Sequence, residues 1–289
     1  MEQFKDKVSI VTGGGSGIGQ SLCQELGRRG SMVVVASLHD DHAERVASTI
    51  TQNGGQAHAV PVDVSNEEDV RRLIDETVSE YGRIDYLFNN AGIAIFGDAR
   101  DLTLEQWRHV LEVNFYGVLY GTVIAYPIMA RQGFGHIVNV ASAAGLFPGP
   151  MNAPYCTSKY AIVGLSFSLR VEGADLGVKV SVVCPGYVRT NIYQAATVVN
   201  VPPEQRGAMT PREMMDASKA ARTILNPHKR MDASKAARTI LSGVSRNKVI
   251  IIFPANVRLA WHLYRLSPRL LDRFLLNNTR AFRNYRLNP

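Results

Sequence analysis

A tyrosine and a lysine, Tyr155 and Lys159, stand four residues apart in a stretch whose apolar spacing predicts a helix. Residues at this spacing lie on one helical face, so the phenol and the ammonium group are expected to be neighbours. A free phenol has a pKa near ~10, too high for a base at neutral pH, and a nearby ammonium group lowers that pKa. The pair can therefore move a proton, although such pairs are common by chance and usually lie on a surface.

Two polar residues elsewhere in the chain can complete such a site. Ser142 follows a Val-rich segment that is typical of a strand, at the carboxyl edge where ligands bind in parallel sheets. Its hydroxyl can hydrogen-bond a substrate oxygen and stabilise charge that develops there. Asn114 is a polar residue between apolar neighbours in a predicted helix, and we expect its amide to hold a water that relays protons from Lys159.

A glycine-rich turn joins the first predicted strand to the first predicted helix. Free N–H groups and the dipole at such a helix N-terminus bind a pyrophosphate. Gly13 permits the tight turn, Gly17 lets the backbone approach the phosphates, and Gly19 lets the helix pack close to the sheet. The turn predicts a dinucleotide site built from Gly13, Gly15, Ser16, Gly17, Ile18 and Gly19.

The residues after the second predicted strand bear on which dinucleotide is bound. An acid there binds the ribose 2′-hydroxyl of NAD and repels the 2′-phosphate of NADP. This chain has Ser37, Leu38 and His39, with Ser37 where the acid is expected. Ser37 can donate to a phosphate and His39 can add charge, although Asp40 and Asp41 follow closely and His39 can equally be a solvated helix-start residue. NADP(H) is favoured modestly, NAD(H) stays open, and no metal is expected.

Later strand ends supply further candidates for the cofactor site. Asp63 and Val64 end the third predicted strand and are placed to meet an adenine ring. Asn90, Ala91 and Gly92 end the fourth, where small residues let a cofactor lie against the backbone. Asn and Gly are also common in ordinary turns, so this segment is informative only together with the others.

The elements that must position these residues alternate between strand and helix. Val- and Ile-rich runs without alternating polarity indicate parallel strands in a sheet that is covered on both faces. Seven strands are predicted at 8–11, 32–36, 57–62, 84–89, 135–142, 178–183 and 248–253, with helices from the glycine turn to Gly30 and at 42–52, 67–81, 104–130 and 153–176. We expect the 104–130 helix to bend or end near Pro127. The predicted fold class is a doubly wound, Rossmann-type, three-layer α/β/α sandwich.

In combination, these motifs resemble those of the short-chain dehydrogenase/reductase family in its compact single-domain form. The matching residues are Thr12-Gly-x-x-x-Gly-x-Gly19, Asn89-Asn-Ala-Gly92, Asn114, Ser142, Tyr155-x-x-x-Lys159 and Pro185-Gly186, over about residues 5–255. The resemblance implies that Tyr155 is the acid/base, that Lys159 tunes its pKa and binds ribose, and that Ser142 binds the substrate oxygen. It also implies cofactor contacts at Pro185, Gly186, Val188 and Thr190, with Thr190 on the nicotinamide amide.

The resemblance implies an NAD(P)(H)-dependent oxidoreductase that interconverts a ketone or aldehyde and an alcohol, and a homodimer or homotetramer. One alternative is a catalytically silent nucleotide-binding scaffold or sensor, although such proteins typically lose the tyrosine or the lysine. An epimerase or dehydratase on a related fold usually carries a longer substrate domain. The chain departs from the family pattern at Ser37, in a repeated segment and in an arginine-rich tail.

The segments expected to flank the substrate are apolar. The proposed contacts are Leu146, Phe147, Met151, Tyr187 and Ile192, with Ile93, Ile95, Phe96 and Tyr193 near them. No cluster of basic residues stands ready for a charged substrate, although Arg189 is near. We therefore expect a hydrophobic ketone or secondary alcohol, while noting that the same residues can be ordinary core.

Composition bounds these interpretations. A chain of 289 residues with 46% hydrophobic and 20% charged residues fits one large α/β domain, expected at 1–254. Its three cysteines, Cys23, Cys156 and Cys184, fit no metal spacing and indicate reduced thiols in a cytosol-like compartment. With no signal peptide and no apolar run of the ~20 residues that a membrane span needs, a cytoplasmic protein is expected.

The C-terminal segment 255–289 is expected to be a basic helical extension. Seven arginines and one acid give it a charge of 7 − 1 = +6 of the total of +7, so the rest of the chain is nearly neutral and nucleic-acid binding is not expected. Helices are predicted at 255–266 and 267–276, with a leucine stripe beside an arginine stripe. Such a segment can lie on an anionic membrane. A helix that closes the substrate pocket or an oligomer interface is the favoured alternative.

A tandem repeat lies within 210–241. Residues Met215–Leu225 recur without change as Met231–Leu241, sixteen residues later. Removing 226–241 leaves one uninterrupted helix-turn-strand unit, whereas a repeat architecture needs at least three units. We therefore interpret one copy as an extra segment and favour the view that it has no function of its own.

Overall fold

A computed structural model describes residues 2–200, 231–269, 275–276 and 280 of the chain. A seven-stranded sheet in the order β11-β7-β6-β4-β1-β2-β3 forms its centre. The strands are β1 (Val8–Thr12), β2 (Met32–Ser37), β3 (Gln56–Pro61), β4 (Tyr86–Asn89), β6 (Gly135–Val140), β7 (Val178–Pro185) and β11 (Ile250–Phe253). Every pair in this sheet is parallel, and the strand order reverses between β1 and β4, where ligands bind in such sheets. The prediction of a Rossmann-type sheet is confirmed.

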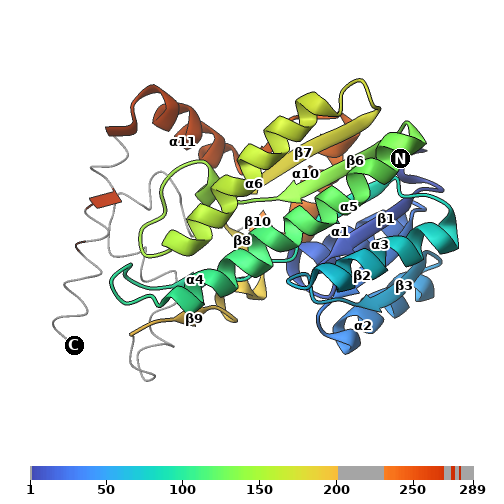
Figure 1. Cartoon of the computed structure of the whole chain (residues 1–289), viewed down its shortest axis with the longest axis horizontal. Coiled ribbons are helices and arrows are strands. Elements are labelled where there is room, and N and C mark those ends of the chain that lie inside the picture. The colour runs from blue at the N-terminus through green and yellow to red at the C-terminus, as the bar shows by residue number, and fades with distance from the viewer. Residues whose placement is uncertain (1, 201–230, 270–274, 277–279, 281–289) are drawn as a thin grey trace.

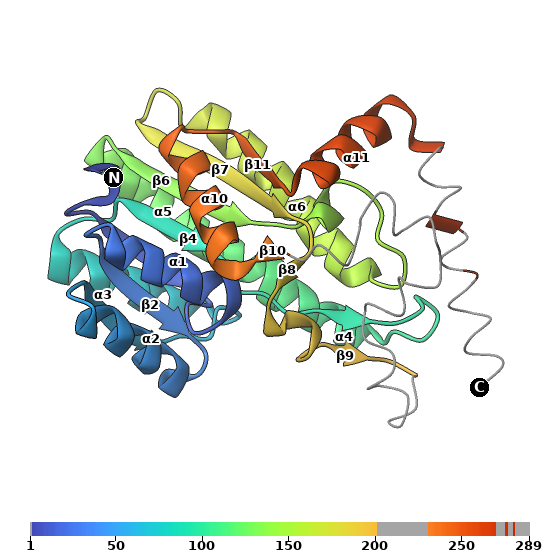
Figure 2. The ribbon, with the colours of Figure 1, turned by 180° about the vertical axis from the view of Figure 1, so that it is seen from behind.

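Helices cover both faces of the sheet (Figure 1). One face carries α3 (Glu67–Tyr81), α5 (Gly117–Gln132) and α6 (Ala153–Glu172), and Figure 2 shows α1 (Gly17–Arg28), α2 (Asp40–Gln52) and α10 (Ala233–Ser245) on the other. Each layer buries its own set of apolar side chains against the strands. The inner strands β1, β2, β4, β6 and β7 are almost fully buried between these layers, which explains their continuous apolar sequence, whereas the edge strand β3 is partly exposed.

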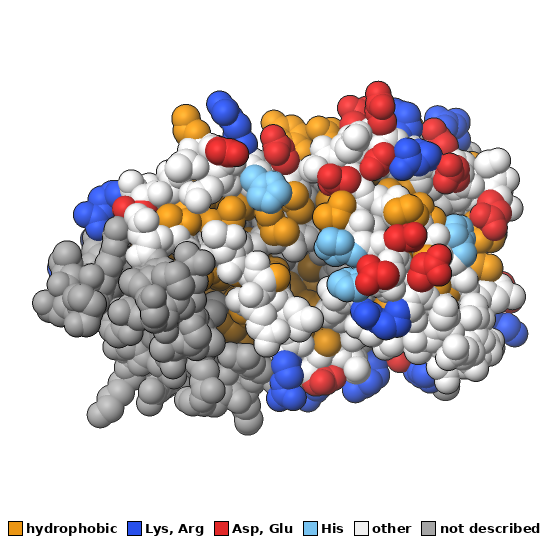
Figure 3. All heavy atoms as spheres, turned by 90° about the horizontal axis from the view of Figure 1, so that it is seen from below, with side chains coloured by type: hydrophobic (Ala, Val, Ile, Leu, Met, Phe, Trp, Pro, Cys, Tyr) orange, Lys and Arg blue, Asp and Glu red, His pale blue; other side chains and the backbone are white. Residues whose placement is uncertain are grey.

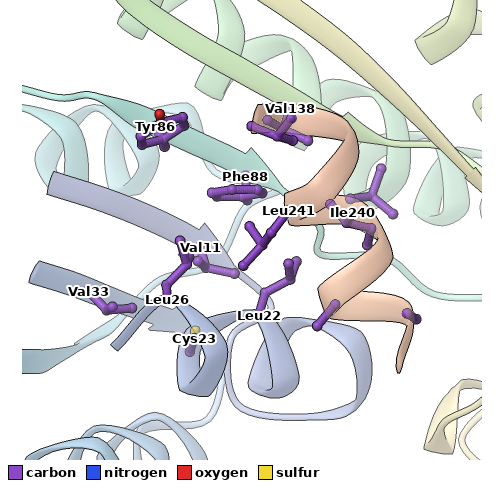
Figure 4. Close-up of a cluster of buried hydrophobic side chains, with 14 of the residues drawn as sticks. Val11, Leu22, Cys23, Leu26, Val33, Tyr86, Phe88, Val138, Ile240 and Leu241 are labelled. Atoms are coloured by element: carbon purple, nitrogen blue, oxygen red, sulfur yellow. The ribbon is translucent and has the colours of Figure 1, made fainter. Parts of the chain in front are cut away.

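The α10 helix comes from the second copy of the tandem repeat. Its residues Ile240 and Leu241 face Leu22 of α1 and Phe88 of β4 in the core shown in Figure 4. Asp232 caps the helix, since its carboxylate accepts a hydrogen bond from the Ser234 N–H at 2.9 Å. The second copy therefore supplies a core helix of the domain, whereas the first copy, Met215–Leu225, lies outside the described residues.

The segment 104–132 corrects one expectation about helix geometry. Pro127 neither ends nor interrupts the helix, because α5 continues to Gln132 and ends at Gly133, whose φ is 72°. The irregular turn lies earlier, where the π-helical residues Glu112–Tyr116 separate α4 (Leu104–Leu111) from α5. Such turns are frequent at functional sites, and this one contains Asn114.

The same segment has the length and composition of a membrane span. Among the described helices it is the one that meets both criteria. Its α5 portion buries Val118, Ile124 and Met129 against the sheet and α3, which is the environment of a core helix.

Two short parallel ladders hold loops above the carboxyl edge of the main sheet. One joins β5 (Ile95–Phe96) to β9 (Thr197–Val198), and the other joins β8 (Val188–Arg189) to β10 (Met231–Asp232). The helix α11 (Ala255–Leu266) follows β11 and packs on the α6 side through its buried residues Val257 and Ala260. The predicted helix at 267–276 lies largely outside the described residues.

Candidate active site

The four predicted catalytic residues come from three separate elements. Tyr155 and Lys159 lie in the first two turns of α6, Ser142 follows β6, and Asn114 lies in the π-helical turn. The sheet brings them together, because β6 ends beside the cleft and α6 crosses above it. The side chain of Lys159 reaches the same space as that of Tyr155, with its Nζ 5.4 Å from the centre of the phenol ring.

The ammonium group of Lys159 is buried, with 3% of the residue exposed. Its Nζ donates a hydrogen bond to the Val140 carbonyl oxygen at 3.1 Å. Burial disfavours the charged form and lowers the pKa of Lys159 from 10.5 to about 8. The cation is thus held beside the tyrosine at the expense of its hydration.

The environment of Tyr155 differs from the expectation. We expected the lysine to lower the pKa of the phenol, but burial raises the pKa of Tyr155 to about 12, and a hydrogen bond with Ser142 opposes that rise. Desolvation outweighs the favourable interactions because this phenol lies in a largely apolar pocket. At neutral pH the side chain therefore carries its proton and is ready to act as an acid.

Ser142 is fixed by the turn that follows β6. It caps the short 3₁₀-helix Ala143–Gly145, and its Oγ accepts a hydrogen bond from the Ala144 N–H at 3.2 Å. Because one lone pair is used in this way, the hydroxyl proton stays available for a neighbouring oxygen. The residue is thus oriented to donate to a substrate oxygen beside Tyr155.

Asn114 is fully buried, and its side-chain amide makes hydrogen bonds with both the N–H and the carbonyl group of Ile93. Its Nδ2 donates to the Ile93 carbonyl oxygen at 3.0 Å, and its Oδ1 accepts from the Ile93 N–H at 2.8 Å. A side chain at Gly92 would place its Cβ 3.1 Å from Asn114 Oδ1 and 3.4 Å from Lys159 Nζ. The missing side chain of Gly92 therefore leaves a position within hydrogen-bonding reach of both groups.

The glycine-rich turn has the geometry that a pyrophosphate needs. Gly13 and Gly17 have φ values of 63° and 55°, a region that favours glycine, and a Cβ at Gly19 would overlap the Gly13 carbonyl oxygen. Ser16 makes no side-chain cap at the start of α1, so the side chain leaves the first N–H groups of the helix free. Asn90 supports the turn, since its Nδ2 donates to the Thr12 carbonyl oxygen at 3.0 Å. The described residues fit a dinucleotide at this position.

A cleft runs from this turn to the catalytic residues. Most of the predicted cofactor residues line it, namely Gly13, Ser16, Gly17, Ile18, Asn90, Ala91, Gly92, Tyr155, Lys159, Pro185, Gly186, Val188 and Thr190. Val140, Ala141, Asn191 and Ala195 also line it and were not predicted. Val140, Ala141 and Ala195 have small or apolar side chains that carry no signal in the sequence, and the place of all four becomes visible only when the strand ends are assembled.

The remaining predicted cofactor residues lie outside this cleft. Gly15 packs against Ser37 and His42, where an added Cβ would lie 2.8 Å from Ser37 Oγ. Leu38 and His39 are exposed beyond the end of β2. Asp63 caps the turn at Ser65, whose N–H donates to its carboxylate at 2.9 Å. The structure thus places these residues outside the cleft that Tyr155 and Lys159 line.

The structure places the side chain of Val64 in the core. Its side chain is buried and packs against Gly117 of α5, where an added Cβ would lie 2.9 Å from it. It therefore belongs to the core beneath the strand end. Arg45 was not predicted from the sequence. Its Nη2 donates a hydrogen bond to the Gly15 carbonyl oxygen at 3.4 Å, which brings a positive charge next to the glycine-rich turn.

A second, mostly apolar cavity adjoins the cleft at the catalytic residues. The cavity encloses about 160 Å³. Figure 3 shows one face of the molecule, with hydrophobic side chains visible inside a hollow. The predicted Phe147, Met151, Tyr187 and Ile192 line it, and Tyr193 stacks between Phe96 and Tyr187 with ring centres 6.3 and 5.7 Å apart. Lining residues that were not predicted include Ala94, Asn152, Val257 and Leu275.

Leu146 is absent from this wall. Leu146 and Phe147 are both buried in the core cluster with Val118 and Ile162, but of the two only Phe147 also lines the cavity. Hydropathy alone does not distinguish these two positions. Val257 and Leu275, by contrast, bring the C-terminal extension to the cavity, in agreement with the view that it helps to close the substrate pocket.

Metal chemistry finds no support in the described part of the chain. Within residues 2–200, 231–269, 275–276 and 280, no group of three or more His, Cys, Asp or Glu side chains could hold a metal ion. The three cysteines are free, and Cys23 and Cys184 are buried.

Several known proteins are similar to this chain in sequence or in structure. The model of the short chain dehydrogenase family matches residues 7–198. Cyclohexanol dehydrogenase of Acinetobacter sp. (strain SE19) is 34% identical over 205 residues, which cover 70% of this chain and 82% of that protein. The uncharacterized oxidoreductase YxjF of Bacillus subtilis (strain 168) is 33% identical over 65% of this chain and 74% of that protein.

Two crystal structures extend the likeness to the whole fold. A short chain dehydrogenase/reductase from Burkholderia phymatum in complex with NAD has a TM-score of 0.79 at 27% identity, covering 94% of this chain and 97% of that one. LigD from Sphingobium sp. strain SYK-6, in its apo form, has a TM-score of 0.75 at 26% identity, covering 93% and 98%. From its motifs, its sheet order and these relatives, the chain belongs to the short-chain dehydrogenase/reductase family of oxidoreductases.

Proposed function

We propose that the protein is a nicotinamide-dependent oxidoreductase that interconverts a ketone or aldehyde and an alcohol. The observation that carries this proposal is that Ser142 and Tyr155 line both the dinucleotide cleft and the apolar cavity. A substrate in the cavity would present its reacting carbon to the cleft and its oxygen to these two hydroxyl groups. When bound, the nicotinamide ring supplies the hydride or takes it up.

In the reduction direction, Tyr155 donates its proton to the carbonyl oxygen. Ser142 donates a hydrogen bond to the same oxygen and stabilises the negative charge that develops there. The burial that raises the pKa of Tyr155 to about 12 keeps the phenol protonated at neutral pH and favours this role. In the oxidation direction the phenolate takes the proton of the alcohol, so a higher pH favours that reaction.

Lys159 and Asn114 support this proton transfer. The ammonium group of Lys159 is buried beside the phenol ring, and we infer that it holds the ribose hydroxyls of the cofactor. A water beside Gly92 would reach both Lys159 Nζ and Asn114 Oδ1, which supports a path that replaces the proton of Tyr155. Each of the four residues thus has a role that its contacts support.

The cavity favours a small hydrophobic substrate. Its volume of about 160 Å³ is close to the roughly 150 Å³ that holds one benzene molecule in a protein interior. The relative named cyclohexanol dehydrogenase makes a six-membered cyclic alcohol a natural first substrate to test. We propose cyclohexanol and cyclohexanone as probes of this size class.

The direct test is an initial-rate assay with cyclohexanol or cyclohexanone and each nicotinamide cofactor, following the absorbance of the reduced ring. The proposal predicts turnover in both directions with at least one cofactor. Tight cofactor binding without turnover of any alcohol or ketone in a broad panel would instead support a silent nucleotide-binding protein.

For the cofactor, we propose a preference for NADP(H). Ser37 replaces the acid that would repel a 2′-phosphate, and Arg45 and His42 bring basic side chains close to Gly15 and Ser37. The structural relative from Burkholderia phymatum was solved with NAD, so the comparison does not favour the phosphorylated form. Fluorescence titration with NADPH and NADH tests the preference, and tighter binding of NADH would refute it.

We also propose a homodimer or homotetramer. On the side of the sheet that carries α5 and α6, five large side chains are exposed on the helical segment before α6 and on α6, namely Tyr116, Val123, Tyr160, Phe167 and Val171. Apolar side chains gathered on neighbouring helices are typical of interfaces between subunits. Sedimentation analysis of the wild type and of Val171→Glu should give an oligomer and a smaller species, and a monomeric wild type would refute the proposal.

For the extension, we propose peripheral contact with an anionic membrane, as on the cytoplasmic leaflet. Leu259 and Leu266 of α11 are 61% and 84% exposed, and Arg258, Arg265 and Arg269 lie near them in a stretch without acids. The same helix contributes Val257 to the cavity. Flotation with anionic and neutral vesicles tests the contact, which should be lost on neutral vesicles and in Leu259→Glu.

A further inference from the structure

Asn152 stands at the start of α6 and lines the substrate cavity, with 8% of the residue exposed. Asparagine at the N-cap of a helix normally accepts a hydrogen bond from a backbone N–H of the first turn. Asn152 makes no such cap, and its buried Oδ1 has no hydrogen-bond partner. A buried polar atom without a partner is rare in proteins and calls for a physical reason.

The backbone holds Asn152 in this position by an unusual conformation. The preceding residue, Met151, has a φ of 62°, a left-handed value that is unfavourable for a residue with a side chain. The Gly97 N–H donates to the Met151 carbonyl oxygen at 2.9 Å and fixes the turn. Strain of this kind is concentrated at ligand sites, and here it presents two consecutive side chains to one cavity.

The other polar groups of the cavity are already in use. Ser142 and Tyr155 hold the reacting oxygen in the proposed reaction, while Tyr187 and Tyr193 stack on each other and have further interactions of their own. No described residue of the cavity wall carries a charge. Among the described wall residues, Asn152 is therefore the side chain with hydrogen-bonding capacity left for a ligand.

We propose that Asn152 binds a second oxygen of the substrate, on the carbon next to the reacting one. An amide carries both a donor and an acceptor, which matches a hydroxyl group, whereas the described wall residues offer no cation to pair with a carboxylate. Asn152 precedes the first turn of α6, which contains Tyr155, and both side chains line the one small cavity, so a single small substrate can reach both with neighbouring oxygens.

The substrate class is then a small vicinal diol, or the hydroxyketone formed from it. Oxidation removes a hydride from one carbinol carbon and a proton from its hydroxyl, and the second hydroxyl stays unchanged on Asn152. This assignment rests on the proposed oxidoreductase function and narrows it. It predicts that a vicinal cyclohexanediol is preferred to cyclohexanol, which has the same ring but lacks the second hydroxyl.

The test compares these two alcohols by calorimetry on the full chain saturated with reduced cofactor, with which alcohols do not react. The diol should bind about 10- to 100-fold more tightly than cyclohexanol, because the unpaired amide is satisfied only by the diol. Asn152→Leu should abolish this preference. The matched control Asn66→Leu changes another helix N-cap, where the side chain accepts from the Glu68 N–H at 2.9 Å, and should retain the preference.

Thermal unfolding distinguishes a ligand role from a structural one. Asn66→Leu should lower Tm because it removes a capping bond, whereas Asn152→Leu should leave Tm unchanged or raise it because no bond is lost. Equal affinities for the two alcohols in the wild type, or a lower Tm with an equal loss of both ligands in Asn152→Leu, would overturn the assignment. A diol preference in binding without turnover of either alcohol would refute the proposed reaction and leave the Asn152 site standing.

Discussion

The buried ammonium group of Lys159 should make the protein less stable than it would be without it. Burial lowers the pKa of Lys159 from 10.5 to about 8, a difference of about 2.5 units. At 1.36 kcal/mol per unit, keeping the charge buried at neutral pH costs about 3 kcal/mol of folding free energy. The substitution Lys159→Met keeps the length of the side chain, removes the charge and tests this cost.

The effect has a defined dependence on pH. Below pH 8 the folded and unfolded chains both carry the proton, so the full cost applies to the wild type. Between about 8 and 10.5 the unfolded chain binds more protons than the folded one, and the stability of the wild type rises with pH. The difference in free energy of unfolding between Lys159→Met and the wild type should therefore fall by about 3 kcal/mol as the pH rises from about 8 to 10.5.

One opposing contribution is independent of pH. The methionine leaves the Val140 carbonyl oxygen without the hydrogen bond that it accepts at 3.1 Å, which costs about 1–3 kcal/mol. The net gain of Lys159→Met near neutral pH is then about 0–2 kcal/mol, and it should turn into a loss at alkaline pH. The change with pH is thus a firmer prediction than the absolute value at any one pH.

Urea unfolding of the wild type and Lys159→Met at a series of pH values measures this difference. Lys179→Met, which removes an exposed lysine of β7, is the matched control for the loss of one positive charge. A pH-independent difference for Lys159→Met, or one that moves in the opposite direction, would refute the account of a desolvated cation. Activity should be lost in the same variant, so a gain in stability would accompany a loss of function.

Two further predictions concern the cofactor turn and the proton. In Gly19→Ala the new Cβ would overlap the Gly13 carbonyl oxygen, and a clash of about 1–3 kcal/mol should weaken dinucleotide binding about 10- to 100-fold in a fluorescence titration; unchanged affinity would argue against this turn as the pyrophosphate site. Because burial raises the pKa of Tyr155 to about 12, alcohol oxidation should quicken steadily from about pH 7 to about pH 9.5 while ketone reduction does not. An oxidation rate that peaks near neutral pH would be inconsistent with a protonated phenol.

The fold was predictable because its signals are local and repeated. Val- and Ile-rich runs such as Val33–Val35 can only be buried on both faces, and the glycine turn marks the first strand and helix. The proximity of Tyr155 and Lys159 was predictable for a similar reason, since their spacing places both side chains on one face of a helix. The environment of the phenol was not, because desolvation depends on everything that packs around it.

The less predictable features depend on tertiary contacts. The π-helical turn at Asn114 and the uninterrupted helix through Pro127 follow from packing, which overrides the usual effect of proline. Leu146 and Phe147 are both apolar and are buried in the same core cluster, but only Phe147 lines the cavity. Asn152 reads in sequence as an ordinary helix start, and only the absence of its capping bond in the structure draws notice to it.

The central claim is that Tyr155 transfers the proton in the reaction. Tyr155→Phe removes one hydroxyl and keeps the ring that lines the cleft and the cavity. The decisive measurement is kcat for this variant with cyclohexanol or whichever alcohol the wild type oxidises, together with its cofactor affinity. The account predicts unchanged cofactor affinity and a fall in kcat of about 10²- to 10⁴-fold. A kcat close to that of the wild type would contradict it.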